Sequence, residues 1–405
     1  MSEHSVDVCV VGAGAAGTAC AQGLARQGAS VALLDRLHPM PDCLKAEKIG
    51  GEGVLALLRL GFQPAVDAAL TPLRNVSVFF GKRALGTLRL DPPEAGLLYH
   101  DFINNLRKHL DARVDFRPGT KAVAFEQGPD RVEVVTGTDA RISCRLVVLA
   151  TGDARHLLEP LGAVYEPQIP FDTFVAAFTL EGEMAHKRSP VDTLTFHHPV
   201  AGGPIAYATF FRLGTALRAN IFCPGPVSEE WQRDLKQRPL ETLVGRNRTL
   251  AEAARSWRVV SPVMIRKLRV ARMQPAPVGR IVVLGDAAHT IDPSGGGGLN
   301  FALLEAELLL GFYAPRWLQQ EVCDYEAIQT FYNDPRRVGA VEWFFNRGRY
   351  IFDLNHDLSL RGRLRRLRFA LSHMLSSRLG ERSKPSLAAS APWHLPAPYL
   401  YEQYQ

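Results

Sequence analysis

Apolar residues near the start of the chain form two runs, at 6–11, broken only by Asp7, and at 30–34. The segment between them has helical character and ends near Gln27. This pattern predicts a strand, a helix and a second strand that ends in Asp35.

The spacing changes to every second position at 73–90, which predicts a β-hairpin that turns at Gly81 and is closed by Pro92 and Pro93. Helices are expected within 43–62, at 97–110, at 228–257, and along most of the chain from 300 to about 377. Strands are expected at 121–126, 131–136, 141–150, 171–180, 193–197, 204–211 and 216–222, the last four in one antiparallel sheet.

Three glycines with the spacing GxGxxG follow the first strand. In a strand–helix–strand unit, Gly12 permits the tight turn, Gly14 lets the backbone approach a pyrophosphate, and Gly17 lets the helix pack closely. Asp35, eighteen residues after Gly17, stands where a carboxylate accepts adenosine ribose hydroxyls. The unit predicts a site for FAD or NAD, and Asp35 disfavours the 2′-phosphate of NADP.

The segment 280–306 carries a second set of small residues between a predicted strand and a predicted helix. Gly285 permits a tight turn, and the carboxylate of Asp286 can hold a ribityl or ribose hydroxyl. Pro293 fixes the following loop. Four glycines at 295–298 then offer backbone N–H groups at a helix start, which suits a pyrophosphate or the polar edge of a flavin.

GDAAH, followed by Pro293, Gly296, Gly298 and Asn300, resembles the second flavin motif of the single-component FAD-dependent monooxygenases of the aromatic hydroxylase (class A, p-hydroxybenzoate hydroxylase-like) family. The resemblance implies an α/β fold with a glutathione-reductase-like (Rossmann-type) FAD-binding domain, an antiparallel β-sheet substrate domain and a helical C-terminus. The expected boundaries are 1–72, 97–163 and 276–330 for the FAD-binding domain, 73–96 and 164–275 for the substrate domain, and 331–405 for the C-terminal helical region and tail.

The resemblance also implies which residues contact the cofactor. Lys45 stands where the family tends to have a basic residue near the flavin, and His100 where it has an Arg or Gln. A solvated lysine and a capping or surface histidine are the alternatives for these two positions. The expected cofactor-binding residues are Gly12, Gly14, Gly17, Asp35, Lys45, His100, Gly285, Asp286, Pro293, Gly296, Gly298 and Asn300.

By this resemblance the protein hydroxylates an aromatic, quinone-like or other electron-rich small molecule. FAD, reduced by NADH or NADPH, would react with O₂ to a C4a-hydroperoxide. Because the flavin carries the chemistry, no catalytic side chain is assigned, and Pro293 is expected near the flavin. Candidates for substrate contact in the antiparallel sheet are His197, Tyr207 and Phe210.

One position departs from the family, which has Ala-Asp-Gly where this chain has Thr151 between Ala150 and Gly152. In the family this aspartate is associated with both FAD and NAD(P)H handling. The electrons are therefore expected either directly from NADH or NADPH, or from flavin reduced elsewhere.

Three alternatives to a monooxygenase stay open. A flavin-dependent reductase of the polyprenyl or geranylgeranyl type would use the same motifs without O₂. A flavin halogenase would carry a WxWxIP motif, whereas Trp257 stands alone in SWRVVSP. A non-enzymatic flavin-bound scaffold would show no turnover. A disulfide reductase is disfavoured, since the sequence lacks a second GxGxxG and a CxxxxC pair.

Composition excludes some classes. The net charge of +6 is small for 405 residues and diffuse, which argues against a nucleic-acid partner. Six scattered cysteines without a CxxC pair and the lack of a secretory signal favour a cytoplasmic location, and no metal site is expected. Arginines and leucines interleave at 360–375 with helical spacing. We favour a helix packed by its leucines on the protein; a peripheral membrane contact is the alternative.

Overall fold

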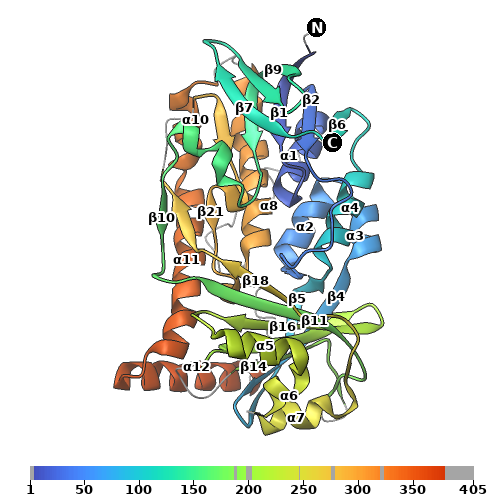
Figure 1. Ribbon diagram of the computed structural model, residues 1–405, viewed down its shortest axis with the longest axis vertical. Helices are drawn as coiled ribbons and strands as arrows, with labels where there is room; N and C mark the ends of the chain where they lie inside the picture. The colour runs from blue at the N-terminus through green and yellow to red at the C-terminus, as the bar shows by residue number, and fades with distance from the viewer. Residues whose placement is uncertain are drawn as a thin grey trace.

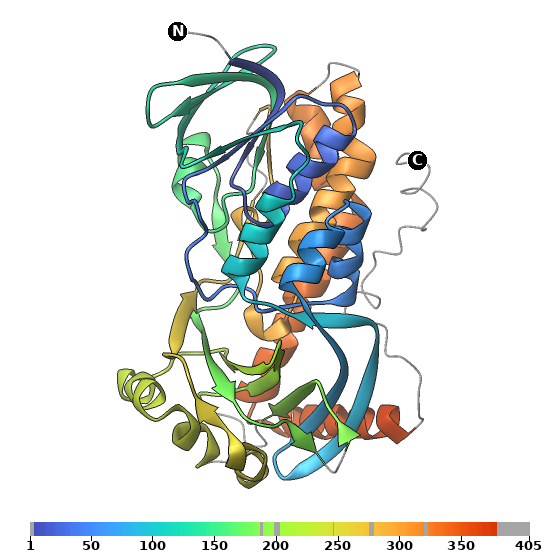
Figure 2. The same cartoon turned by 90° about the vertical axis from the view of Figure 1, so that its right-hand side faces the viewer.

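The computed structural model describes residues 4–186, 189–197, 203–245, 247–274, 279–319 and 323–378. Two β-sheets occupy opposite ends of the long axis, and long helices run along it beside them (Figure 1). A quarter turn shows the same division (Figure 2). This arrangement confirms the mixed α/β class expected from the sequence.

The first sheet follows the order β6-β2-β1-β9-β8-β7, and β20 also pairs with β9. Its strands are β1 (His4–Val11), β2 (Val31–Asp35), β6 (Val114–Pro118), β7 (Ala122–Gln127), β8 (Val132–Thr136), β9 (Arg141–Leu149) and β20 (Ile281–Val283). β6, β2, β1, β9 and β20 run parallel, whereas β8 and β7 are joined antiparallel. Every residue of β2 is buried, as its uninterrupted apolar run predicts.

Helices pack on the first sheet. α1 (Ala15–Arg26) contacts β2 and α8 (Gly298–Leu308), and its many alanines and glycines allow a close approach. A π-helical segment, Leu309–Tyr313, joins α8 to α9 (Ala314–Gln319). The other helices of this half are α2 (Gly51–Arg59), α3 (Gln63–Ala69), α4 (Tyr99–Lys108) and α10 (Tyr325–Tyr332).

The second sheet follows the order β17-β11-β16-β15-β14-β4-β5-β3, with β18 also paired to β11. Its strands are β3 (Lys48–Ile49), β4 (Thr71–Phe80), β5 (Arg83–Gly96), β11 (Thr173–Glu181), β14 (Thr193–His197), β15 (Tyr207–Leu213), β16 (Ala216–Cys223), β17 (Arg258–Val259) and β18 (Met264–Leu268). All pairs are antiparallel except β14 with β4. The helices α5 (Glu229–Gln237), α6 (Pro239–Val244) and α7 (Arg248–Ala253) add Leu235, Leu243 and Leu250 to the core on one face of this sheet.

Short elements complete the fold. One small sheet contains β10 (Tyr165–Pro167), β19 (Ala271–Met273) and β21 (His289–Thr290), and another pairs β12 (Ala185–His186) with β13 (Ser189–Pro190). Single 3₁₀ turns are η1 (Arg155–Leu157), η2 (Glu159–Leu161), η3 (Ala254–Ser256), η4 (Gly285–Ala287) and η5 (Pro293–Gly295).

β5 continues through Pro92 and Pro93, although the sequence pattern predicts that they close the hairpin. Its pairing with β4 changes register around Arg74, so that residues 90–93 bulge between two registers. Proline has no N–H to donate to a ladder and fits at such a bulge. The prolines therefore lie within the strand, and the predicted end of the hairpin is wrong.

The C-terminal helices are α11 (Pro335–His356) and α12 (Leu360–Arg378), and α12 lies across the far end of the second sheet (Figure 1). α12 packs through Phe369 against Val78 and Leu85 of the hairpin. The leucines that we expected to pack are instead 47–74% exposed: Leu360, Leu364, Leu367, Leu371 and Leu375. The favoured prediction is therefore wrong, because the opposite face of the helix makes the contact.

The end of the sequence, 379–405, lies outside the described residues. Within the part of the chain that the structure describes, no helix combines the length and the apolar character needed to cross a bilayer.

Candidate cofactor and substrate site

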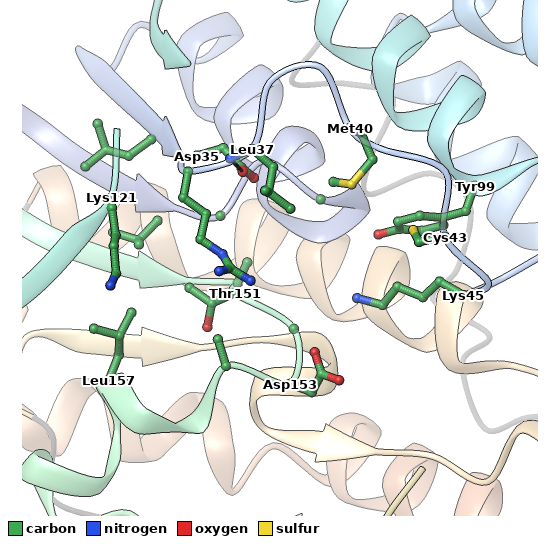
Figure 3. A pocket seen from close by; sticks show the side chains of 18 of the residues that line it. Asp35, Leu37, Met40, Cys43, Lys45, Tyr99, Lys121, Thr151, Asp153 and Leu157 are labelled. Atoms are coloured by element: carbon green, nitrogen blue, oxygen red, sulfur yellow. Dashed lines mark hydrogen bonds between the residues drawn. The ribbon is translucent and has the colours of Figure 1, made fainter. Parts of the chain in front are cut away.

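Two cavities adjoin between the sheets. The strand-end cavity, of about 550 Å³, lies at the carboxyl ends of β1, β2 and β9 (Figure 3). This is where ligands bind in open α/β sheets. The inter-sheet cavity, of about 230 Å³, lies between the starts of α1 and α8 and the second sheet. Both cavities are lined by Gly14, Lys45, Tyr99, Ala150, Gly152 and Arg266, so they meet at these residues.

The three glycines of the first motif have different roles. Gly12 has φ +101°, and a Cβ there would lie 2.5 Å from the Ala150 carbonyl oxygen. A Cβ on Gly17 would lie 1.8 Å from the Gly12 carbonyl oxygen. A Cβ on Gly14 would lie 3.3 Å from the Tyr99 hydroxyl and would project into the cavity wall. Two of the glycines are thus required by the fold, and Gly14 keeps the cavity open.

Two helices begin at the inter-sheet cavity, and neither has a side-chain cap. The first backbone hydrogen bonds run from Thr18 to Gly14 (2.9 Å) in α1 and from Phe301 to Gly297 (2.7 Å) in α8. The N–H groups before these bonds have no acceptor within their helices. Free N–H groups and the positive ends of two helix dipoles favour an anion at this place.

Asp35 ends β2 and ties it to the glycine turn. Its Oδ2 accepts hydrogen bonds from the Ala13 N–H (2.7 Å) and the Arg107 guanidinium (2.8 Å), and its Oδ1 accepts the Leu37 N–H (2.7 Å). A carboxylate has about four acceptor positions, so about one is left for a ribose hydroxyl. The sequence predicted a ribose contact but not the three bonds that orient this carboxylate.

Lys45 lies where the two cavities meet, and Figure 3 shows its ammonium directed into the cavity. Its Nζ is 3.5 Å from Asp286 Oδ2 and 5.4 Å from the centre of the Tyr99 ring. Tyr99 and, less strongly, Asp286 raise the pKa of Lys45 against the opposing effect of burial. The structure therefore places Lys45 in the cavity wall and not in a solvated loop.

The turn that presents Asp286 is fixed from behind. Gly285 has φ +62°, and its N–H donates to Glu305 Oε2 (2.7 Å). Glu305 is fully buried and bonds with Arg337 (2.6 Å). Burial raises the pKa of Glu305, and the Arg337 charge opposes this shift. This buried pair holds the turn at the end of β20.

Thr151 lies in the wall of the strand-end cavity (Figure 3). Its hydroxyl oxygen is buried and has no hydrogen-bond partner among the residues that the structure describes. Buried polar atoms are normally satisfied, so this hydroxyl can serve a ligand. The position supplies a hydrogen bond but no charge.

Pro293 begins η5 and lines the inter-sheet cavity. The preceding Asp292 accepts hydrogen bonds from the Ser294 N–H (2.8 Å) and hydroxyl (2.6 Å) through Oδ1. Its Oδ2 is buried and lacks a partner in the described part of the chain. Burial raises the pKa of Asp292 to about 6. The loop before α8 therefore contains a carboxyl group that is ionised only above mildly acidic pH.

The glycine run lines the inter-sheet cavity, whereas Asn300 does not. Gly296 and Gly298 line the inter-sheet cavity, and Gly296 has φ +57°. The Asn300 side chain is buried and accepts the Gly50 N–H (2.9 Å), and it is absent from the described linings of both cavities. Asn300 thus holds α2 against α8, and the structure does not bring it to the cofactor side.

His100 lies away from the described cavity walls. Its imidazole is 3.2 Å from Asp42 and 3.4 Å from Asp101, whereas Tyr99 lines both cavities. Neighbouring helix residues point about 100° apart, and of these two only Tyr99 faces the cavities. The structure places Tyr99 in the cavity walls, where the family resemblance had predicted His100.

The three residues predicted to contact the substrate lie in three different places, and only Tyr207 lines a cavity. Tyr207 lines the inter-sheet cavity and donates its hydroxyl to the Ser294 carbonyl (2.7 Å). Phe210 is fully buried on the opposite face, 4.7 Å from Trp257, because alternation along β15 puts it there. His197 pairs with Tyr207 across the strands but is covered by Phe369 at 4.8 Å. Burial lowers the pKa of His197 to about 3.

Several lining residues were not anticipated. β15 and β16 contribute Thr209 and Asn220, which are directly paired across the strands and which period-two alternation could have identified. Arg266 comes from β18 and Arg347 from α11. These two arginines lie on separate elements distant in sequence, and no local pattern predicts that they meet here.

Glu47 of the inter-sheet cavity forms a buried pair with Arg218 of β16 through bonds of 2.6 and 2.8 Å. Burial raises the pKa of Glu47, and Arg218 opposes this shift. The pair joins the segment before β3 to the second sheet. It therefore fixes one wall of the cavity relative to the other.

Together these features fit a long, bent dinucleotide. The strand-end cavity can hold an adenosine beside Asp35 and Thr151, and two helix N-termini with Lys45 suit a diphosphate. The inter-sheet cavity can hold a flat ring against Pro293 and the glycine run. In the described part of the chain, no three His, Cys, Asp or Glu residues cluster as metal ligands.

Comparisons with known proteins agree with this geometry. The FAD binding domain family matches residues 5–311. Mitochondrial squalene epoxidase 2 of Arabidopsis thaliana is 25% identical over 360 residues, covering 84% of this chain and 59% of that protein. Pentachlorophenol 4-monooxygenase of Sphingobium chlorophenolicum is 25% identical over 330 residues, covering 74% of this chain and 56% of that protein. The chain thus spans less than two thirds of the length of these relatives.

Solved structures share the fold. A p-nitrophenol 4-monooxygenase from Pseudomonas putida superposes with a TM-score of 0.71 at 18% identity, covering 93% of this chain and 95% of that one. A flavin-dependent brominase superposes with a TM-score of 0.69 at 15% identity, covering 94% and 96%. The family match extends over more than half of the 405 residues, and the chain therefore belongs to the FAD binding domain family.

Proposed function

We propose that this protein is an FAD-dependent monooxygenase that hydroxylates an aromatic or other electron-rich small molecule. The observation that carries the proposal is the inter-sheet cavity, where two uncapped helix N-termini and Lys45 lie beside a ring-sized space. Relatives named as phenol monooxygenases support the choice of reaction.

In this proposal the cofactor residues are the cavity-lining residues of the two motifs, together with Lys45 and Thr151. Asp35 and Thr151 would hold the adenosine part, Gly14 and Lys45 the diphosphate, and Asp286 the ribityl chain. Pro293 and Gly296 would lie against the isoalloxazine ring of the flavin. We also propose the glutathione-reductase-like form of the FAD domain and the division into FAD-binding, substrate and C-terminal parts at the boundaries expected from the sequence.

When bound and reduced, FAD supplies the activation of O₂. The protein's own contribution is binding, orientation and exclusion of water. The Glu47–Arg218 pair and the Tyr207–Ser294 bond hold the second sheet over the inter-sheet cavity, so that a ring bound there stays in place. NADH or NADPH is the proposed reductant, with externally reduced flavin as the alternative that the uncharged Thr151 leaves open.

A second candidate reaction is epoxidation of an alkene, which the squalene epoxidase relatives favour. The inter-sheet cavity, however, presents Thr209, Asn220 and Arg347 from the sheet side and α11. These groups suit a polar ring better than a hydrocarbon chain. Reductase, halogenase and scaffold functions are the remaining alternatives.

The test is anaerobic reduction of the FAD-loaded protein with NADH and with NADPH, followed by a pulse of O₂ in the presence of phenols. We expect reduction by one nucleotide and transfer of one ¹⁸O atom from ¹⁸O₂ to a phenol. Fast reduction without O₂-dependent product would favour the reductase. A protein that cannot be loaded with FAD would contradict the cofactor assignment itself.

We also propose a cytoplasmic location with a peripheral membrane contact through α12. Its outward leucines are flanked by Arg361, Arg363 and Arg368, which are exposed as well. A leucine stripe between arginines fits the interface of a membrane with anionic lipids. The helix α12 lies at the end of the second sheet that is far from the first sheet (Figure 2).

A further inference from the structure

Helix α11 begins at Pro335, outside the residues 5–311 that match the FAD binding domain family. It runs along the long axis of the molecule (Figure 1) and packs on η5 and α8, which contain the two ends of the glycine run. The helix belongs to the proposed C-terminal part of the chain. Its inner face nevertheless contacts the segments that carry the second set of cofactor residues.

Arg337 is buried on this inner face and bonds to both sides of the turn that presents Asp286. Its Nε donates to Glu305 Oε1 (2.7 Å), and Glu305 Oε2 accepts the N–H of Gly285, the residue before Asp286 (2.7 Å). Another guanidinium nitrogen of Arg337 lies 3.0 Å from His289 Nε2. Because a guanidinium only donates, His289 accepts this bond as a neutral imidazole, and burial lowers its pKa accordingly. Arg337 therefore fixes the segment 285–289 at both ends.

One turn pair further along, α11 lies against the loop that carries the glycine run. A Cβ on Gly348 would lie 2.7 Å from the Cβ of Asp292, and a Cβ on Gly295 would lie 3.1 Å from the backbone nitrogen of Gly348. A Cβ on Gly297 would lie 2.1 Å from a ring carbon of Phe344. The helix thus touches this loop almost without intervening side chains. One side of the loop lines the inter-sheet cavity, and α11 supports the other.

We propose that α11 is part of the cofactor site and that Arg337 is a positioning residue for FAD. Arg337 does not touch the cofactor. It holds the Asp286 carboxylate at the cavity wall through Glu305 and His289, so its contribution to FAD binding passes through Asp286. The inference rests on the role proposed for Asp286 in binding FAD, and it does not depend on which reaction follows.

The test is a double-mutant cycle in the dissociation constant of FAD, measured on the full chain. Arg337→Met is combined with Glu305→Gln, so that no buried charge is left without a partner and Gly285 keeps an acceptor. This pair of substitutions should lower FAD affinity about tenfold when Asp286 is present. In Asp286→Ala the same pair should change the affinity less than about threefold, because the carboxylate through which Arg337 acts is absent.

Arg337→Lys makes the same comparison with a smaller perturbation of the core. A lysine keeps a charge beside Glu305 but lacks the planar fork that also reaches His289. We expect Arg337→Lys to keep most of the FAD affinity that the paired substitutions lose. Its remaining loss should disappear in Asp286→Ala.

Arg336→Met is the matched control on the same helix. The described partners of Arg336 are Asp334, at 2.6 Å, and the Phe312 ring, at 3.9 Å from its centre. Losing this ion pair should lower the stability of the apoprotein in urea. The FAD affinity of the folded protein should stay unchanged, because these partners lie outside the turn of Asp286.

Equal losses of FAD affinity with and without Asp286 would overturn the inference. A loss of urea stability without a loss of FAD affinity would also overturn it, since Arg337 would then have only a structural role. Unchanged affinity in Asp286→Ala would overturn the role proposed for Asp286 as well. FAD binding is measured without turnover, so a failure of hydroxylation shows separately, as intact coupling between Arg337 and Asp286 without O₂-dependent product.

Discussion

Lys45, where the two cavities meet, forms an ion pair with Asp286 of the inter-sheet cavity, with Nζ 3.5 Å from Oδ2. They come from opposite walls, one from the loop after β2 and the other from the turn after β20. A dinucleotide that fills both cavities would lie beside this pair. We therefore expect the two side chains to exchange this contact for contacts with the diphosphate and the ribityl chain.

Replacing Asp286 with Ala should lower FAD affinity about tenfold or more, because a charge-assisted hydrogen bond to a ribityl hydroxyl is lost. Flavin content after dialysis and the dissociation constant of FAD are the measurements. Asp286→Asn keeps a hydrogen-bond acceptor but not the charge, so its FAD affinity should lie between those of the unmodified protein and Asp286→Ala. Unchanged or increased flavin content in Asp286→Ala would show that the carboxylate has another role.

Gly14→Ala and Gly17→Ala should separate a cofactor contact from a fold requirement. The Gly17 methyl would lie 1.8 Å from the Gly12 carbonyl oxygen, so the apoprotein should lose about 1–3 kcal/mol of stability or more. The Gly14 methyl meets only the Tyr99 hydroxyl at 3.3 Å, so the apoprotein should remain nearly as stable while FAD affinity falls. Urea unfolding and FAD titration measure the two effects. Full FAD affinity in Gly14→Ala would contradict the expected close approach of the cofactor.

Asp292 should make stability depend on pH. Its folded pKa of about 6 lies above the ordinary value of 3.8, so the folded state binds more protons in this interval. Stability should therefore fall as pH rises from about 4 to 6, by up to about 3 kcal/mol in total. Asp292→Asn can still accept the hydrogen bonds from Ser294, and its stability should not fall over this pH interval. Urea unfolding of the apoprotein at a series of pH values measures the difference.

Asp334→Asn is the matched control for this pH series. Burial acts to raise the pKa of Asp334, but hydrogen bonds from Arg336 and Tyr313 lower it to about 2. Stability from that group is complete above its ordinary pKa of 3.8 and is lost only as pH falls toward 2. The control should therefore shift stability by a constant amount between pH 4 and 7. If Asp292→Asn also changed the stability by the same amount at every pH between 4 and 7, the raised pKa of Asp292 would be refuted.

The leucine stripe of α12 should bind anionic vesicles. Replacing Leu360, Leu364, Leu367 and Leu371 with Ser should abolish flotation with phosphatidylglycerol vesicles and leave the fold intact, since these side chains are exposed. Flotation of the unmodified protein should weaken at high salt, because the arginines contribute electrostatically. Equal flotation of both proteins would contradict the proposed membrane contact. Failure of the unmodified protein to float would also contradict it.

Features set by a few neighbouring residues were predictable from the sequence. The glycine turn, β1, α1 and β2 follow from local spacing, and so does the position of Asp286 at a strand end. β6 was missed because VDFRP mixes charge with few apolar residues. Helical spacing grouped the leucines of α12 correctly but could not show which face packs, since Phe369 on the other face makes the contact.

The residues that line the cavities could be predicted only in part, because the sequence does not show in which direction each side chain points. Tyr207 and Phe210 are three positions apart on one strand, so alternation alone puts them on opposite faces, yet it does not say which face lines a cavity. That depends on which side the helices α5 to α7 cover. Arg347 and Arg266 were beyond prediction for a different reason. Their meeting depends on the packing of distant elements, which leaves no trace in local spacing.

The position of β20 in the first sheet has a consequence for how the chain is made. Val147–Leu149 of β9 pairs with β1 on one side and with Ile281–Val283 on the other. During synthesis at about 5–20 residues per second, the second edge of β9 stays bare for roughly 10 s until β20 emerges from the ribosome. An apolar strand edge is then open to pairing with other chains. Nascent protein should consequently need chaperone protection until almost three quarters of the chain has been translated.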